Sequence, residues 1–145
     1  MTFKAPEVAE ILGGQATLKR RVRSVEDLRA AVEAGLPLES LDLTVGRLAK
    51  SPRAAAELTH QIVPRSTLKR IKSRLNRVQS ERLERLARMT ALTEEVYEDP
   101  ELAHEFLTSA QPQLGGERPV DLARSDLGTR QVEQLLSRIE YSLPA

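Results

Sequence analysis

Apolar side chains recur along the chain at spacings of three and four residues, the pattern of helices that bury one face against a core. The clearest example begins after Ser24, a good N-terminal cap with Asp27 at the capping-box position, and ends at Gly35, a residue typical of helix C-termini. No stretch alternates apolar and polar residues as a strand does, so the pattern predicts an all-α fold. The apolar positions of the clearest helix are Val25, Leu28, Ala31 and Val32.

Proline and cap residues mark the starts of several shorter helices. The N-terminal stretch is ambiguous, because residues 6–12 have room only for a short helix before Gly13-Gly14 ends it. The other helices predicted from these signals open at Pro37, at Ser51-Pro52 over residues 54–60, at Asp99-Pro100 through Leu107, and at Pro119 through Leu122.

Three longer segments complete the predicted helices. After a turn at residues 61–63, a helix is expected over residues 64–72. Ser80 is expected to cap the longest helix, residues 81–98, which is apolar around so much of its circumference that it must lie between other helices. The last helix is expected to start at about Thr129 and to present one apolar face.

The composition supports a helical interior built from aliphatic side chains. Apolar residues make up 40% of the sequence but aromatic residues only 3%, which favours helices packed on helices. The absence of cysteine excludes disulfides and thiolate metal sites and fits a reducing compartment. No apolar run has the length of a signal peptide or a membrane span, so we expect a soluble, cytoplasmic protein that contacts no membrane.

Charge is distributed unevenly between the two halves of the chain. Residues 1–77 hold 15 Lys and Arg against 8 Asp and Glu, a net charge of +7, whereas residues 78–145 hold 7 against 13, a net charge of −6. We therefore expect a basic N-terminal arm over residues 1–23, a basic helical unit over 24–77 and an acidic helical unit over 78–145. The basic half of the chain is then suited to binding a polyanion. Chance clustering of solvated charge is the alternative explanation.

Residues 54–72 have the form of a helix-turn-helix, with a helix of small residues, a short turn and a second helix whose outer face is basic. In that motif the second helix enters the major groove of DNA. The candidate DNA-binding residues are Arg65, Ser66, Lys69, Arg70 and Lys72, while Lys72, Arg74 and residues 19–23 suit phosphate contacts. Ile62 departs from the glycine that many such turns contain. A structural helix pair with a solvated cationic face remains the alternative.

No catalytic or metal-binding set can be identified in the sequence. His60 and His104 stand alone, without a cysteine or a second histidine at ligand spacing, and ordinary polar roles are expected for both. The carboxylates between Glu94 and Glu101 lack a neighbouring base or nucleophile and are expected to form a solvated acidic surface. Gly115-Gly116 is expected to be a turn. We therefore expect a protein that is not an enzyme and needs no cofactor or metal.

Five segments of the chain form a series with a fixed order and spacing: Val63–Leu68, Ser80–Arg88, Glu95–Pro100, Leu114-Gly115-Gly116 followed by Pro119, and Val132–Glu140. Together they make the chain resemble the Xre/ParS-type antitoxins that are paired with RES-domain toxins. Gly35-Leu36-Pro37 also resembles the N-terminal region of that family. Tyr141-Ser142 departs from it, because family members often have His-Gly there.

The resemblance implies an Xre-like helix-turn-helix unit followed by a small helical domain that binds a RES-domain toxin, an enzyme that destroys NAD. It also implies that the C-terminal end of the antitoxin reaches the toxin's active-site cleft. The candidate toxin-binding residues are Glu140, Tyr141, Ser142, Leu143, Pro144 and Ala145. The carboxylate of Glu140 and the terminal carboxylate of Ala145 would take the positions of the dinucleotide phosphates, and Tyr141 and Leu143 would fill apolar space. Frayed terminal residues are the alternative.

The resulting hypothesis is an antitoxin of a type II pair that occludes its toxin and, as a homodimer, represses its own operon by binding operator DNA. The main rival is a stand-alone helix-turn-helix transcriptional regulator whose C-terminal domain only dimerises. A small enzyme is disfavoured, because the candidate nucleophiles lack identifiable neighbours.

Overall fold

The computed structural model describes residues 1–142, and within that range it is built from helices, turns and two isolated β-bridges. The predicted all-α fold is therefore confirmed for this part of the chain. Among these helices, none combines the length and the apolar character needed to cross a bilayer. In chain order the helices are α1 Ala5–Ile11, α2 Gly14–Leu18, α3 Val25–Ala34, α4 Leu38–Leu48, α5 Pro52–Ile62, α6 Arg65–Leu68, α7 Arg77–Tyr97, α8 Pro100–Thr108, the 3-10 helix η1 Pro112–Leu114, α9 Pro119–Leu122 and α10 Asp126–Ser142.

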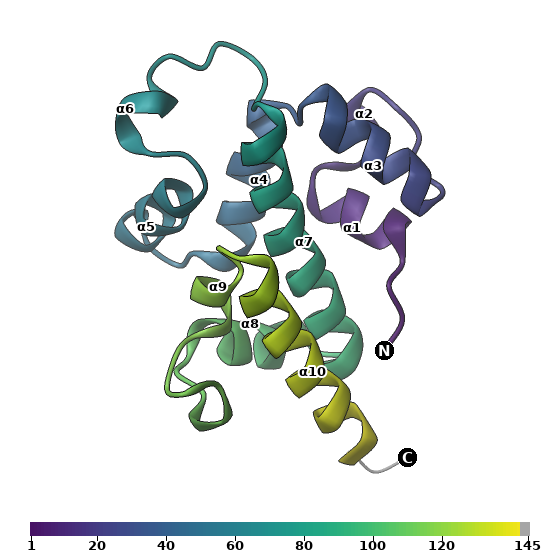
Figure 1. Ribbon diagram of the computed structural model, residues 1–145, viewed down its shortest axis with the longest axis vertical. Coiled ribbons are helices and arrows are strands. Elements are labelled where there is room, and N and C mark those ends of the chain that lie inside the picture. The colour runs from purple at the N-terminus through teal and green to yellow at the C-terminus, as the bar shows by residue number, and fades with distance from the viewer. Residues whose placement is uncertain (143–145) are drawn as a thin grey trace.

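Helix α7 is the axis of the molecule (Figure 1). Helices α1, α3, α4 and α5 pack against it from the first half of the chain, and α8 and α10 pack against it from the second half. Two polar residues of α7, Thr90 and Thr93, are buried. Each hydroxyl donates to the carbonyl oxygen four residues earlier, so neither leaves an unsatisfied donor. The buried apolar residues of α7 are Leu83, Leu86, Ala87, Met89, Ala91, Leu92 and Val96.

One continuous core crosses the expected boundary after residue 77. The buried apolar cluster runs from Ala5 to Leu136 and includes side chains from both halves of the chain. Because α7 is covered on one side by the first half and on another by the second half, the two units share this helix and do not have separate cores.

The expected N-terminal arm over residues 1–23 is shorter in the structure. Residues 5–18 form α1 and α2, whose Val8, Leu12 and Leu18 are buried in the core. The hydroxyl of Ser40 in α4 donates a hydrogen bond to the carbonyl oxygen of Leu12 at 2.6 Å. This bond gives a partner to one of the carbonyl groups left without one at the C-terminus of α1. Only residues 19–23 remain as a basic segment outside helices.

The predicted caps of three helices are confirmed. Ser24 Oγ accepts from the amide of Asp27 at 3.1 Å, and Ser51 Oγ accepts from the amide of Ala54 at 3.1 Å. Asp99 Oδ1 accepts from the amide of Glu101 at 2.8 Å. These contacts each join residues two or three positions apart, so the sequence alone contains the information for them.

The longest helix begins one turn earlier than predicted. Its cap is Asn76, whose Oδ1 accepts from the amide of Gln79 at 2.8 Å, while Gln79 Oε1 accepts from the amide of Asn76 at 2.9 Å. This reciprocal pair is a capping box. Ser80, the expected cap, is instead buried inside α7 and accepts from the amide of Leu36 at 2.8 Å.

The helix predicted over residues 64–72 is also wrong in extent, because α6 ends at Leu68. The chain then turns and pairs with the segment between α3 and α4. The amide of Leu75 donates to the carbonyl oxygen of Leu36 at 2.8 Å, and the amide of Leu38 donates to that of Ser73 at 2.9 Å. Leu75 is thereby buried, and this tertiary pairing outweighs the helical preference of the segment. The preceding turn is shorter than expected too, since α5 continues through Ile62.

Candidate functional site

Two short segments, residues 19–23 and 65–77, contain ten Lys and Arg side chains without an acidic partner. No carboxylate oxygen among residues 1–142 lies within 4.0 Å of their charged side-chain nitrogens, although the backbone amide of Arg23 donates to Asp27 Oδ2 at 2.9 Å. Unpaired cations at this density produce a positive potential that suits a polyanion. The ten residues, which we call the basic surface, are Lys19, Arg20, Arg21, Arg23, Arg65, Lys69, Arg70, Lys72, Arg74 and Arg77.

The basic surface stands out because many other cations of the chain are paired. Arg47, Arg118 and Arg130, for example, hold carboxylates at 2.6 to 3.1 Å. The pKa of Arg47 is raised by its hydrogen bond to Glu94, and the pKa of Arg118 is raised by its hydrogen bond to Asp121. Eight of the other twelve Lys and Arg residues have a carboxylate partner within residues 1–142, whereas Arg82, Arg85, Arg124 and Arg138 have none. The basic surface is therefore the larger group of cations available to solvent or to a partner.

The fold brings the two basic segments together. Lys19, Arg20 and Arg74 line one pocket, although Lys19 and Arg74 are far apart in the sequence. Lys19 caps α2 with a left-handed backbone at φ 58°, and Arg74 Nη1 donates to the carbonyl oxygen of Gly35 at 2.8 Å. In Figure 1 the loop between α6 and α7 arches over one end of the molecule, the end where α7 begins and where α2 also lies.

The structure changes the geometry of the predicted DNA-binding residues. Arg65 and Ser66 lie on α6, whereas Lys69, Arg70 and Lys72 lie on the turn and loop that follow it, and all five are exposed. A four-residue helix is only about 6 Å long. The five residues are therefore available to phosphates, but they do not form the extended recognition helix that the sequence suggested.

The charges of α7 oppose the helix dipole. Arg77 lies in the first turn, and Glu94 and Glu95 lie in the last, although cations are favoured at C-termini and anions at N-termini. Ion pairs compensate at the acidic end: Lys4 Nζ lies 3.5 Å from Glu95 Oε1, and Arg47 binds Glu94. At the basic end no such compensation is present within residues 1–142.

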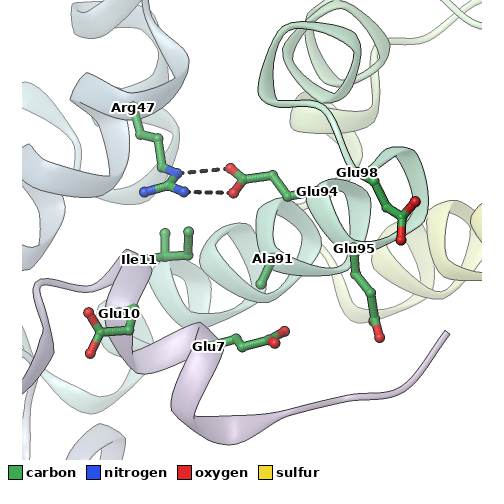
Figure 2. Close-up of a pocket in the computed structure, with 8 residues that line it drawn as sticks. All are labelled: Glu7, Glu10, Ile11, Arg47, Ala91, Glu94, Glu95 and Glu98. Carbon is green, nitrogen blue, oxygen red and sulfur yellow. Dashed lines mark hydrogen bonds and ion pairs between the residues drawn. The ribbon is translucent and has the colours of Figure 1, made fainter.

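An open pocket lies at the acidic end, between α1, α4 and α7 (Figure 2). Arg47 of α4 lines it and binds Glu94 with two of its three guanidinium nitrogens, Nε at 2.8 Å from Oε2 and Nη2 at 2.6 Å from Oε1. The expected acidic surface is therefore partly committed to structural contacts, since Asp99 also caps α8 and Glu101 pairs with Lys50 at 3.5 Å. The acidic residues that line the pocket are Glu7, Glu10, Glu94, Glu95 and Glu98.

The first half of the predicted toxin-binding tail is helical. Helix α10 continues through Ser142, and Tyr141 on its last turn is 87% exposed. The Glu140 carboxylate contacts the amino group of Met1, which places the end of α10 beside the start of the chain. Leu143, Pro144 and Ala145 lie outside the described residues.

The two histidines make hydrogen bonds to main-chain carbonyl groups. His104 Nε2 donates to the carbonyl oxygen of Leu48 at 2.7 Å and so ties α8 to the end of α4. His60 Nδ1 lies 3.3 Å from the carbonyl oxygen of Val63. These are structural contacts of the ordinary kind expected for both residues.

One charged pair was not found by the sequence analysis. Glu84 lies on α7 with Arg88 one turn later, their charged groups 3.7 Å apart, and burial raises the pKa of the Glu84 carboxyl despite the nearby Arg88. Glu84 Oε2 and Arg88 Nε are buried without a hydrogen-bond partner among residues 1–142. The i and i+4 spacing of the pair was visible in the sequence, but the burial was not.

Two family descriptions match adjoining parts of the chain. Residues 27–88 match the antitoxin Xre-like helix-turn-helix domain, and residues 92–141 match the antitoxin Xre/MbcA/ParS C-terminal toxin-binding domain. No curated protein matches the chain. The junction between the two matches falls inside α7, the helix that both halves of the core share.

Proposed function

The chain belongs to the Xre/ParS-type antitoxins, and from this we propose that its partner is a RES-domain toxin that degrades NAD. The protein acts by binding and not by catalysis: it blocks the toxin's active site. With or without the toxin, it also represses its own operon as a homodimer.

The observation that carries the toxin-binding proposal is the end of α10, in the region matched by the toxin-binding domain. Tyr141 projects there with 87% of its surface exposed, next to the carboxylate of Glu140. An exposed tyrosine has a large apolar body and a polar tip, the combination enriched where proteins bind one another. The Glu140 carboxylate is in contact with the amino group of Met1, and it can complement the cationic groups of a dinucleotide cleft only by exchanging that contact for one with the toxin.

The basic surface supports the operator-binding part of the proposal. Its ten cations have no acidic partner within the described range, so binding phosphates breaks no existing ion pair. Each neutralised phosphate releases counterions, which makes such binding strongly dependent on salt. Because α6 is short, we expect phosphate contacts to contribute more of the affinity than base contacts do.

The toxin-binding proposal is tested by co-expression with the RES-domain protein of a neighbouring gene. The full chain is expected to copurify with that protein, restore growth and preserve cellular NAD. A chain that lacks residues 141–145 is expected to fold normally by circular dichroism but to lose protection. Leu127→Ala, at a 74% exposed position near the start of the same helix, is the matched control that keeps protection.

Two outcomes of this experiment would contradict the proposal. Failure of the full chain to bind the RES-domain protein removes that toxin class as the partner. Full protection by the truncated chain removes the tail from the inhibitory contact. A separate promoter-shift assay tests repression, and the absence of a retarded band in the presence and absence of toxin would exclude operator binding.

A further inference from the structure

We propose that the pocket between α2, the α3–α4 connection and Arg74 is a binding site for a single phosphate group. The proposal deepens the operator-binding function and rests on it for the source of the phosphate, which is then the DNA backbone. The site itself is argued from the charges, the hydrogen bonds and the backbone of its lining residues. A free phosphorylated ligand is the other source that this chemistry admits, and the experiment distinguishes the two.

The pocket has a volume of about 320 Å³, and all its charged lining residues are cations. They are Lys19, Arg20 and Arg74, and no carboxylate within residues 1–142 lies within ion-pair distance of any of them. The rest of the lining consists of small and apolar residues such as Ala31, which cannot neutralise them. Three like charges around one open pocket repel one another, and an anion in the pocket relieves that repulsion.

The guanidinium of Arg74 is held in place with most of its donors free. Nη1 donates to the carbonyl oxygen of Gly35 at 2.8 Å, and this is its one hydrogen bond recorded among residues 1–142. A guanidinium carries five N–H donors in a planar fork, so the remaining donors can bind two oxygens of a phosphate at once. An arginine that is already positioned loses little side-chain entropy when the anion binds.

The backbone on both sides of the pocket is fixed as well. The pairing of Leu75 with Leu36 and of Leu38 with Ser73 holds Arg74 against the α3–α4 connection. On the opposite side, Lys19 occupies the left-handed region at φ 58°, a conformation that non-glycine residues adopt at an energetic cost. This conformation ends α2, and Lys19 and Arg20 then line the same pocket as Arg74.

The site differs from the rest of the basic surface. Arg65, Lys69 and Arg70 are exposed cations on α6 and its following turn, and they do not line this pocket. They provide general attraction to a polyanion, whereas the three pocket residues line one pocket. We therefore expect this pocket to fix the register of the protein on the DNA backbone.

The first arm of the test uses inorganic pyrophosphate and the full-length chain labelled with ¹⁵N. Titration is expected to shift the amides of residues 18–20, 34–36 and 74–75 in a saturable way. Lys19→Asn removes one charge and retains a residue that tolerates the left-handed backbone, so it should weaken binding severalfold without altering the fold. Arg74→Ala should abolish the saturable shifts, and Arg65→Ala, a cation outside the pocket, should leave them unchanged.

The second arm measures binding of promoter DNA by fluorescence anisotropy over a series of salt concentrations. Lys19→Asn and Arg74→Ala are each expected to lower the slope of log K against log salt by about one unit. Arg130→Ala, a cation of α10 outside the basic surface, is expected to leave the slope unchanged, and circular dichroism confirms that each variant is folded.

The two arms fail separately. Pyrophosphate shifts that do not saturate, or that survive both Lys19→Asn and Arg74→Ala, overturn the phosphate site whatever the DNA result. Saturable shifts together with no DNA binding by the wild type keep the site, assign it to a free phosphorylated ligand, and remove the operator-binding function. DNA binding that is insensitive to both pocket variants shows that the operator is held elsewhere on the basic surface.

Discussion

Gly35 is the position where a single methyl group should do the most damage to the basic end of the molecule. It ends α3 with φ 93° and ψ 121°, a backbone conformation that L side chains rarely adopt. A Cβ atom added there would lie 2.4 Å from the carbonyl oxygen of Leu75, well inside van der Waals contact. Because that oxygen belongs to backbone, it cannot move away as the end of a flexible side chain would.

The expected loss of stability in Gly35→Ala has two parts. Holding a non-glycine residue at positive φ costs about 1–3 kcal/mol. To relieve the overlap, the Leu75 segment must move away from Leu36. This movement weakens the 2.8 Å hydrogen bond from the Leu75 amide to the Leu36 carbonyl oxygen, a bond that contributes about 1 kcal/mol. We therefore expect a loss of about 2–4 kcal/mol, a large share of the 5–15 kcal/mol that stabilises a typical domain.

Urea unfolding followed by circular dichroism measures this loss, and Gly46→Ala is the matched control. Gly46 lies inside α4, and a Cβ added there meets no atom within 4 Å. Alanine at that position should stabilise the protein by up to about 1 kcal/mol through its helix propensity. The two substitutions are chemically identical and are expected to have opposite signs. A urea midpoint for Gly35→Ala at or above that of the wild type would refute the close approach of Leu75.

Three further predictions test other parts of the structure. Tyr141→Ala should change the unfolding free energy by less than about 0.5 kcal/mol, because the side chain is 87% exposed. The same substitution should weaken toxin binding by about 2 kcal/mol in titration calorimetry, and an unchanged affinity removes Tyr141 from the interface. Asn76→Ala should lose about 1 kcal/mol of stability with the capping box of α7, seen as a lower melting temperature, and an unchanged melting temperature contradicts the cap. Burial raises the pKa of Glu84 in the folded protein above its unfolded value, so the wild type should gain stability relative to Glu84→Gln as pH falls through the acid range. If urea unfolding shows the same difference in unfolding free energy between the two proteins at pH 7 and at pH 4, the buried carboxylate is rejected.

The sequence predicted best those features that depend on contacts between near neighbours. The caps at Ser24 and Asp99 join residues two or three positions apart, and both were found. The capping box of Asn76 with Gln79 has the same range and was missed, although its spacing is visible in the sequence. Ser80 also has the side chain of a good cap, and its actual role, burial against Leu36, depends on tertiary structure that the sequence does not show.

Features that depend on distant segments were not predictable in the same way. Residues 69–75 contain the spacing of a helix, yet Leu75 reaches the core through pairing with Leu36, which helical continuation would prevent. The candidate site shows the same division. The basic character of Lys19 and Arg74 was read from the sequence, whereas their convergence on one pocket requires the packing of α2 and the α3–α4 connection.

The arrangement of charge along α7 bears on the proposal that one small protein binds both a toxin and DNA. The helix has 21 residues, and a helix of that size is about 31 Å long. Helix α2 and the loop before α7 lie at the end of the molecule where α7 begins, whereas α10 ends at the opposite end (Figure 1). Tyr141 belongs to the last turn of α10, so the proposed toxin contact and the proposed phosphate pocket are on different parts of the fold. The basic surface and the end of α10 share one packed core, so a substitution that loosens the core along α7 disturbs both of them. A substitution at an exposed residue of one surface affects that surface alone.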